Sequence, residues 1–148
     1  MIQQKLFSHC RSYIAETLNG FENRKAEILL ALESESKSSA GDKHETGRAM
    51  IQIEREKLGE QIKKFELHQK NLIHLKNHIR SELVKLGSVV TTNQSNYYIS
   101  FPVTECIVKS KTYYCISAQS PIGKLLLGKK VGDQIIFNNT TSLILEVF

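Results

Sequence analysis

Apolar residues recur every seven positions through the middle of the chain. The repeated positions are occupied by Ile51, Leu58, Phe65, Leu72, Ile79 and Leu86. A seven-residue spacing this regular is typical of a coiled-coil helix, because it keeps one apolar seam facing a partner helix. The pattern therefore predicts one long helix that ends near Leu86.

A second amphipathic segment precedes it, with apolar residues at steps of three and four over residues 2–36 and no proline to interrupt them. Such spacing predicts a helix with one apolar face. The two segments are similar in length, which favours an antiparallel hairpin within one chain over a dimeric rod. That pairing places Phe21 near Ile62 and Ile2 near Leu83, and it predicts a monomer.

A short polar stretch, residues 38–46, separates the two helical patterns. Gly41 can adopt the left-handed conformation that ends the first helix. Asp42 can cap the second helix, with Glu45 three residues later in a capping-box arrangement. One end of the hairpin is therefore expected to carry two carboxylates, a pair that ordinary helix capping would also explain.

At Gly87 the helical period gives way to short runs rich in β-branched and aromatic residues. Turn-like residues separate these runs, which predict an antiparallel sheet. The expected strands are 88–92, 97–103, 105–109, 112–117, 134–138 and 142–148. Leu86 is expected to lead through Gly87 directly into the first strand, with no connector.

One short helix is expected among the strands, with Ser120 as its N-cap, Pro121 as its first residue and Gly128 as its C-terminal stop. The fold class is α+β. We expect a coiled-coil hairpin over residues 1–86, followed by a small sheet domain with one helix packed on it over residues 87–148.

The 148 residues are 41% hydrophobic, which argues against disorder, and the formal charge of +5 permits a polyanionic partner. Cys10, Cys106 and Cys115 are odd in number and form no Cys-x-x-Cys pair, so neither a disulfide framework nor a zinc site is indicated. No signal peptide or membrane-spanning run is evident. We therefore expect a cytoplasmic protein that does not associate with membranes.

Two groups of residues are candidates for a metal site or a catalytic pair. His74 and His78 are four residues apart on the predicted helix and could share a metal ion, with Glu82 as a loose third candidate. A solvent-exposed helix face explains these histidines as well. Cys10 follows His9, but neighbouring residues on a helix point apart, which argues against a nucleophile and base pair.

The polar tip has the motif Gly41-Asp42-x-x-Glu45, and residues 116–133 have the sequence ISAQSPIGKLLLGKKVGD. These two motifs occur in the same order in the bacterial Gre transcript cleavage factors, which this chain resembles. The resemblance implies an FKBP-like β-grasp C-terminal domain. It implies that the hairpin enters the secondary channel of RNA polymerase, where Asp42 and Glu45 are the catalytic pair. They would hold Mg²⁺ jointly with the polymerase, so that backtracked RNA is cut.

Two further sets of residues acquire a role through this resemblance. Gln119, Ser120 and Pro121 match the loop that contacts the rim of the polymerase channel, although Ser-Pro at a helix start is also ordinary capping. Basic residues around the tip would contact phosphates of the RNA 3′ end, and coiled-coil surface charge is the alternative reading. These basic residues are Lys37, Lys43, Arg48, Arg55 and Lys57.

The function indicated is that of a transcription elongation factor, not a stand-alone enzyme, that stimulates the nuclease activity of RNA polymerase. Lys43 and His44 stand where Gre factors commonly have Leu and Ser. A Gre-fold regulator that occupies the channel without cleavage is therefore a second hypothesis. An FKBP-like prolyl isomerase or a coiled-coil scaffold are weaker ones.

Overall fold

The structure is a computed structural model that describes residues 2–37 and 42–148, with no side chains described for 35–37 and 42–44. It divides into two compact units, Ile14–Gln69 and the combination of Met1–Tyr13 with Lys70–Phe148. The predicted α+β class is confirmed. The elements in chain order are α1 (Ile2–Lys37), α2 (Asp42–Lys76), β1 (Val89–Thr92), β2 (Asn96–Ser100), β3 (Cys106–Val108), β4 (Lys111–Ser117), α3 (Pro121–Leu126), β5 (Gln134–Phe137) and β6 (Thr140–Val147).

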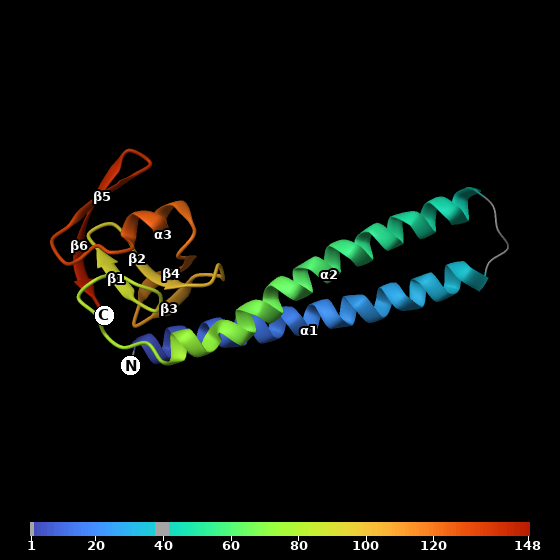
Figure 1. Cartoon of the computed structure of the whole chain (residues 1–148), viewed down its shortest axis with the longest axis horizontal. Helices are drawn as coiled ribbons and strands as arrows, with labels where there is room; N and C mark the ends of the chain where they lie inside the picture. Colours follow the sequence, from blue (N-terminus) through green and yellow to red (C-terminus); the bar gives the residue numbers. More distant parts are fainter. Residues whose placement is uncertain (1, 38–41) are drawn as a thin grey trace. The chain divides into compact units, whose positions relative to one another are not determined.

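Within the unit Ile14–Gln69, α1 and α2 lie side by side and run in opposite directions (Figure 1). Ile28 and Leu32 of α1 and Leu58 and Ile62 of α2 form its buried core. Phe21 packs against this cluster, which confirms the predicted proximity of Phe21 and Ile62. The apolar seams read from the sequence therefore do face one another in this unit.

Phe21 and Phe65 form an edge-to-face pair across the two helices, with ring centroids 5.5 Å apart. Substituting Phe65→Asp removes this pair and places a carboxylate at the seam. We expect it to destabilise the hairpin by about 2–4 kcal/mol in chemical denaturation. Leu67→Asp is the matched control, because Leu67 is 56% exposed and should change stability by no more than about 0.5 kcal/mol. Equal effects of the two changes would contradict the seam.

The predicted extent of the second helix was wrong. α2 ends at Lys76, and residues 77–88 form an irregular connector instead of entering a strand directly. Ile79, a predicted seam residue, is 76% exposed, and Leu83, the predicted partner of Ile2, is 50% exposed. The seven-residue spacing at Ile79 and Leu86 is therefore not part of the coiled coil.

The connector leaves the helix because it packs into the C-terminal domain. Val84 is buried there, its N–H donates to Lys129 O at 2.8 Å, and its carbonyl accepts from Gly128 N at 2.9 Å. Gly87 N donates to Ile99 O at 2.7 Å. A helix continued through residues 77–88 would break these bonds and withdraw Val84 from the core.

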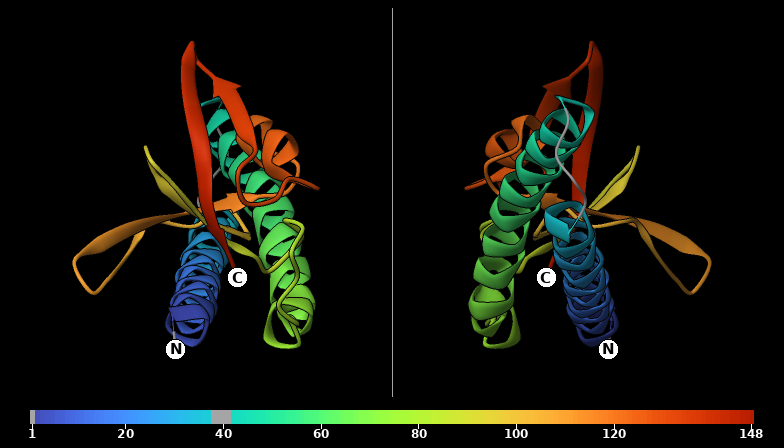
Figure 2. Two further views of the ribbon diagram at one scale, coloured as in Figure 1. Left: turned by 90° about the vertical axis from the view of Figure 1, so that its left-hand side faces the viewer. Right: turned by 90° about the vertical axis from the view of Figure 1, so that its right-hand side faces the viewer.

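The six strands form a sheet in the order β3-β4-β2-β1-β6-β5, and the β5–β6 hairpin appears in red in Figure 2. Each of the six predicted strands is present, with ends that differ by a few residues. The prediction of a wholly antiparallel sheet was wrong, because β2 and β4 are parallel. Residue patterns set the strands but leave their pairing partners open.

Residues in the left-handed conformation make two tight hairpin turns. They are Lys109 and Ser110 between β3 and β4, and Asn138 and Asn139 between β5 and β6, with φ between 50° and 65°. Two consecutive positive-φ residues match the natural twist of paired strands. Both turns lie where the sequence predicted them.

The core of the C-terminal domain joins the sheet to α3. Val90, Ile99 and Ile144 of the sheet pack with Ile122 and Leu126 of α3 in one buried cluster. Ser120 and Pro121 occupy the predicted N-cap and first helical positions. Across residues 2–37 and 42–148, no helix combines the length and the apolar character needed to cross a membrane.

Candidate functional site

The structure places the predicted catalytic pair at the start of α2. Asp42 is the first residue of the helix, and Glu45 is exposed in its first turn. Lys37 is the last residue of α1, and Lys43 is the second residue of α2. The side chains of Asp42, Lys37 and Lys43 lie outside the described residues, as does Gly41, so the predicted helix stop and capping box stay predictions.

The other basic residues divide between two sides of α2. Arg48, Arg55 and Lys57 are all exposed. With about 3.6 residues per turn, Arg48 and Arg55 fall on the same side of the helix as Glu45, whereas Lys57 falls on a different side. Arg48 and Arg55 therefore lie on the Glu45 side of α2, roughly one and three helical turns from Glu45.

Lys57 borders a shallow hollow with Met50, Ile53 and Glu54. Met50 is 67% exposed and Ile53 is 53% exposed. This side of α2 is thus chemically distinct from the side that carries Glu45.

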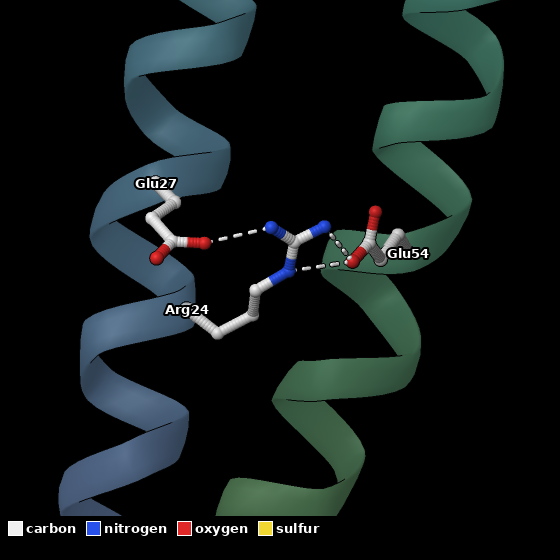
Figure 3. Close-up of polar contacts among 3 residues, drawn as sticks. All are labelled: Arg24, Glu27 and Glu54. Carbon is white, nitrogen blue, oxygen red and sulfur yellow. Dashed lines mark hydrogen bonds and ion pairs between the residues drawn. The ribbon is translucent and has the colours of Figure 1, made fainter.

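An ion-pair network connects the two helices alongside the apolar seam (Figure 3). Arg24 Nη1 donates to Glu27 Oε2 at 2.7 Å on α1, and Arg24 Nε donates to Glu54 Oε1 at 2.8 Å on α2. A further bond joins Arg24 Nη2 to the same Glu54 oxygen. The hydrogen bonds from Arg24 to Glu27 and Glu54 raise the pKa of Arg24. The two bonds to Glu54 Oε1 join α1 and α2 at this level of the hairpin.

The second candidate region is the corner between β4 and α3. Ser120 Oγ accepts from Gly123 N at 3.1 Å and donates to Ser117 O at 2.6 Å. Gln119 N donates to Ser117 Oγ at 3.1 Å. The hydroxyl of Ser120 is therefore committed to holding the corner, and its side chain is half-buried.

Gln119 and Pro121, in contrast, are exposed on either side of Ser120. The backbone of α3 approaches this corner closely at Gly123, where an added Cβ would lie 2.1 Å from Ser117 O. Only glycine permits that approach. The corner therefore presents two exposed side chains on a tightly held backbone.

The structure removes the geometric basis for a metal site at His74 and His78. His74 lies in the last turn of α2, but His78 lies beyond the end of that helix, so they are not one turn apart on a helix face. Among the described residues, no group of three or more His, Cys, Asp or Glu side chains is placed to hold a metal ion.

His78 instead anchors the connector, a role the sequence did not indicate. Its Nδ1 lies 3.1 Å from Leu86 O, and its Nε2 lies 3.2 Å from Phe148 O. Gly87 has φ +89°, and a Cβ there would come within 2.7 Å of the His78 ring.

The three cysteines are free thiols, as expected, and two of them are buried. Cys10 Sγ of α1 donates to Ser100 Oγ of β2 at 3.6 Å. The contact with Cys10, together with burial, raises the pKa of Cys115 on β4. The same contact lowers the pKa of Cys10, so the two buried thiols form one hydrogen-bonded pair.

A scan of known protein families matches residues 80–147 to the family described as "Transcription elongation factor, GreA/GreB, C-term". A search of curated proteins finds no match. The matched region begins inside the connector, so it includes Val84 and the contacts that hold Val84 to the sheet. Residues 80–147 are therefore similar to the C-terminal domain of GreA/GreB, and this match supports a transcription elongation factor of the Gre family.

Proposed function

We propose that this elongation factor binds RNA polymerase, inserts the α1–α2 hairpin into the secondary channel and stimulates cleavage of backtracked RNA. The observation that carries the proposal is the GreA/GreB match over residues 80–147 in a chain whose second helix begins at Asp42. The catalytic centre is that of the polymerase. This chain supplies side chains to it and is proposed to work as a cytoplasmic monomer.

Asp42 and Glu45 are of the type that suits Mg²⁺, because Mg²⁺ prefers oxygen ligands and is often held by one or two carboxylates, with water and phosphate completing its shell. Glu45 is exposed at the start of α2, where an outside partner can reach it. When bound, Mg²⁺ shared with the polymerase would supply Lewis-acid chemistry for phosphodiester hydrolysis. The role of Asp42 and Glu45 is to hold that ion and to accept hydrogen bonds from the attacking water.

Arg48 and Arg55 support contact with RNA, because they lie on the side of α2 that carries Glu45. Guanidinium groups recognise phosphate oxygens without reading sequence. We propose that they position the phosphates of the RNA 3′ end while the carboxylates act at the scissile bond. Lys37, Lys43 and Lys57 are proposed as weaker, more peripheral contacts.

The proposed route of entry can be tested with a photocrosslinking amino acid at Ala49, which is exposed on α2. Crosslinks from this position should form to polymerase surfaces that line the channel leading to the catalytic centre. The same amino acid at Lys111, exposed at the start of β4, is the control and should label other surfaces. Identical crosslinks from both positions would argue against insertion of the hairpin.

The β4–α3 corner is proposed to dock on the rim of the channel through Gln119 and Pro121. Replacing both with alanine should weaken polymerase binding about tenfold, the size expected for exposed anchor residues. Ser120 is retained in this variant because its hydroxyl holds the corner. Gln134→Ala, an exposed position on β5, is the control and should leave affinity unchanged. Unchanged affinity of the double variant would remove the corner from the interface.

A further inference from the structure

Beside the anchored connector lies a cavity of about 590 Å³, formed entirely by residues of the unit that contains Met1–Tyr13 and Lys70–Phe148. Arg11 of α1 and Lys76 of α2 line it, together with His78. None of the described residues that line this cavity is acidic. The cavity is therefore a concentration of positive charge separate from the hairpin tip and from the β4–α3 corner.

The two longest cationic side chains of the cavity have no carboxylate partner in the described part of the chain, because the ion pairs found there involve neither Arg11 nor Lys76. The guanidinium of Arg11 lies over the ring of Phe7, 5.8 Å from its centroid. This contact restricts the orientation of Arg11 and leaves its N–H groups to bind an anion.

His78 forms part of the cavity wall. Its two ring nitrogens face two backbone oxygens, Leu86 O and Phe148 O. The contacts fix the ring, so this part of the cavity wall is held in place by the connector.

The remaining walls are mixed in character and indicate the size of a ligand. Phe7 is half-buried and supplies apolar surface, whereas Leu75 and Tyr98, which also line the cavity, are almost fully buried. Gln3 supplies an amide whose Nε2 donates to Gly87 O at 3.4 Å. A volume of about 590 Å³ is within the range of roughly 300–1,000 Å³ found for small-molecule sites. It exceeds what a single phosphate ion needs. Cationic side chains beside an apolar wall are suited to bind a ligand that combines an anionic group with an organic part.

We propose that this cavity binds a small organic phosphate of mononucleotide size, with Arg11 and Lys76 holding the phosphate and Phe7 contacting its organic part. The proposal does not rest on the transcriptional role, because the cavity belongs to the free protein. A phosphate offers oxygens that two cations can bind together, which a neutral metabolite cannot do.

Calorimetric titration of the full chain with AMP, adenosine, inorganic phosphate and citrate tests the proposal at fixed ionic strength. We expect AMP to bind more tightly than inorganic phosphate, and adenosine and citrate to bind least. Arg11→Gln and Lys76→Gln should each weaken AMP binding at least about tenfold, as expected for loss of a charge-assisted bond. Lys5→Gln is the charge-matched control on α1, because Lys5 is exposed and does not line the cavity.

Three results would overturn the assignment. The first is no heat or shift in melting temperature with AMP at millimolar concentration, and the second is citrate binding as tight as AMP binding. The third is equal weakening by Lys5→Gln and Lys76→Gln, which would indicate general charge attraction. Lys76 is exposed at the end of α2, so its substitution is expected to leave the fold intact and to keep the test decisive.

Discussion

Asp42→Asn is expected to reduce stimulated transcript cleavage by about 100-fold or more, because a ligand of a catalytic metal contributes several kcal/mol to transition-state stabilisation. Asparagine is itself a favoured residue at helix starts, so the same change should alter helix stability by only about a few tenths of a kcal/mol. The substitution therefore separates a catalytic role of Asp42 from a capping role. Cleavage by a stalled, backtracked complex and thermal unfolding measure the two effects.

The control for this variant is Asp133→Asn, the same chemical change at the other aspartate of the chain. Asp133 Oδ2 accepts from Lys130 N at 2.9 Å, and an asparagine oxygen can accept this bond too. Asp133→Asn should therefore retain cleavage. Raised Mg²⁺ should partly restore activity to Asp42→Asn, since lost metal affinity is the expected defect. Full activity of Asp42→Asn at limiting Mg²⁺ would reject a metal-binding role for this carboxylate.

Gly123→Ala is expected to destabilise the C-terminal domain by at least about 2 kcal/mol, a large effect for the addition of one methyl group. The new Cβ would lie 2.1 Å from Ser117 O and 2.9 Å from Ser120 Oγ. To relieve this overlap, α3 must move away from β4, and the bonds that Ser120 makes to Ser117 and Gly123 must lengthen. Denaturant unfolding and polymerase affinity should both report the change.

Gly20→Ala is the matched control. Gly20 lies within α1, and an added Cβ there meets no atom within 4 Å. Alanine is the better helix former, so this change should be neutral or stabilising by up to about 1 kcal/mol. If Gly123→Ala were as stable as the wild type, the close packing at the corner would be incorrect.

The hairpin was predictable because its signal is local and repeated. Leu58 and Leu72 are buried at the positions that the seven-residue spacing assigned to the seam, and Phe65 pairs with Phe21. Strands and the α3 cap were predictable for a similar reason: turn residues and the Ser120-Pro121 pair act on their immediate neighbours. Local chemistry at these positions agrees with the final fold.

The end of α2 and the pairing of β2 with β4 were not predictable in this way. Ile79 continues the seam spacing, but the burial of Val84 and the contacts of His78 draw the connector into the C-terminal domain. These contacts join residues far apart in the chain, so periodicity carries no sign of them. The parallel register of β2 and β4 depends likewise on the path of the whole chain.

For the candidate site, the sequence predicted which residues belong to it but not which of them lie on the same side of α2. Helical geometry joins Arg48 and Arg55 to Glu45 and separates Lys57 from them. At the corner, the sequence pattern did not distinguish among Gln119, Ser120 and Pro121. The structure distinguishes Ser120, whose hydroxyl is used internally, from its exposed neighbours.

The most direct test of the proposed function is the length of the RNA in a stalled, backtracked complex of the cognate polymerase after addition of the purified protein. Stimulated cleavage predicts that the transcript loses a short 3′ fragment in a Mg²⁺-dependent manner, and that the shortened RNA can be extended again. Binding of the protein to the polymerase with no shortening of the transcript at any Mg²⁺ concentration would contradict this account. In that case a channel-occupying regulator that does not promote cleavage would be the better description.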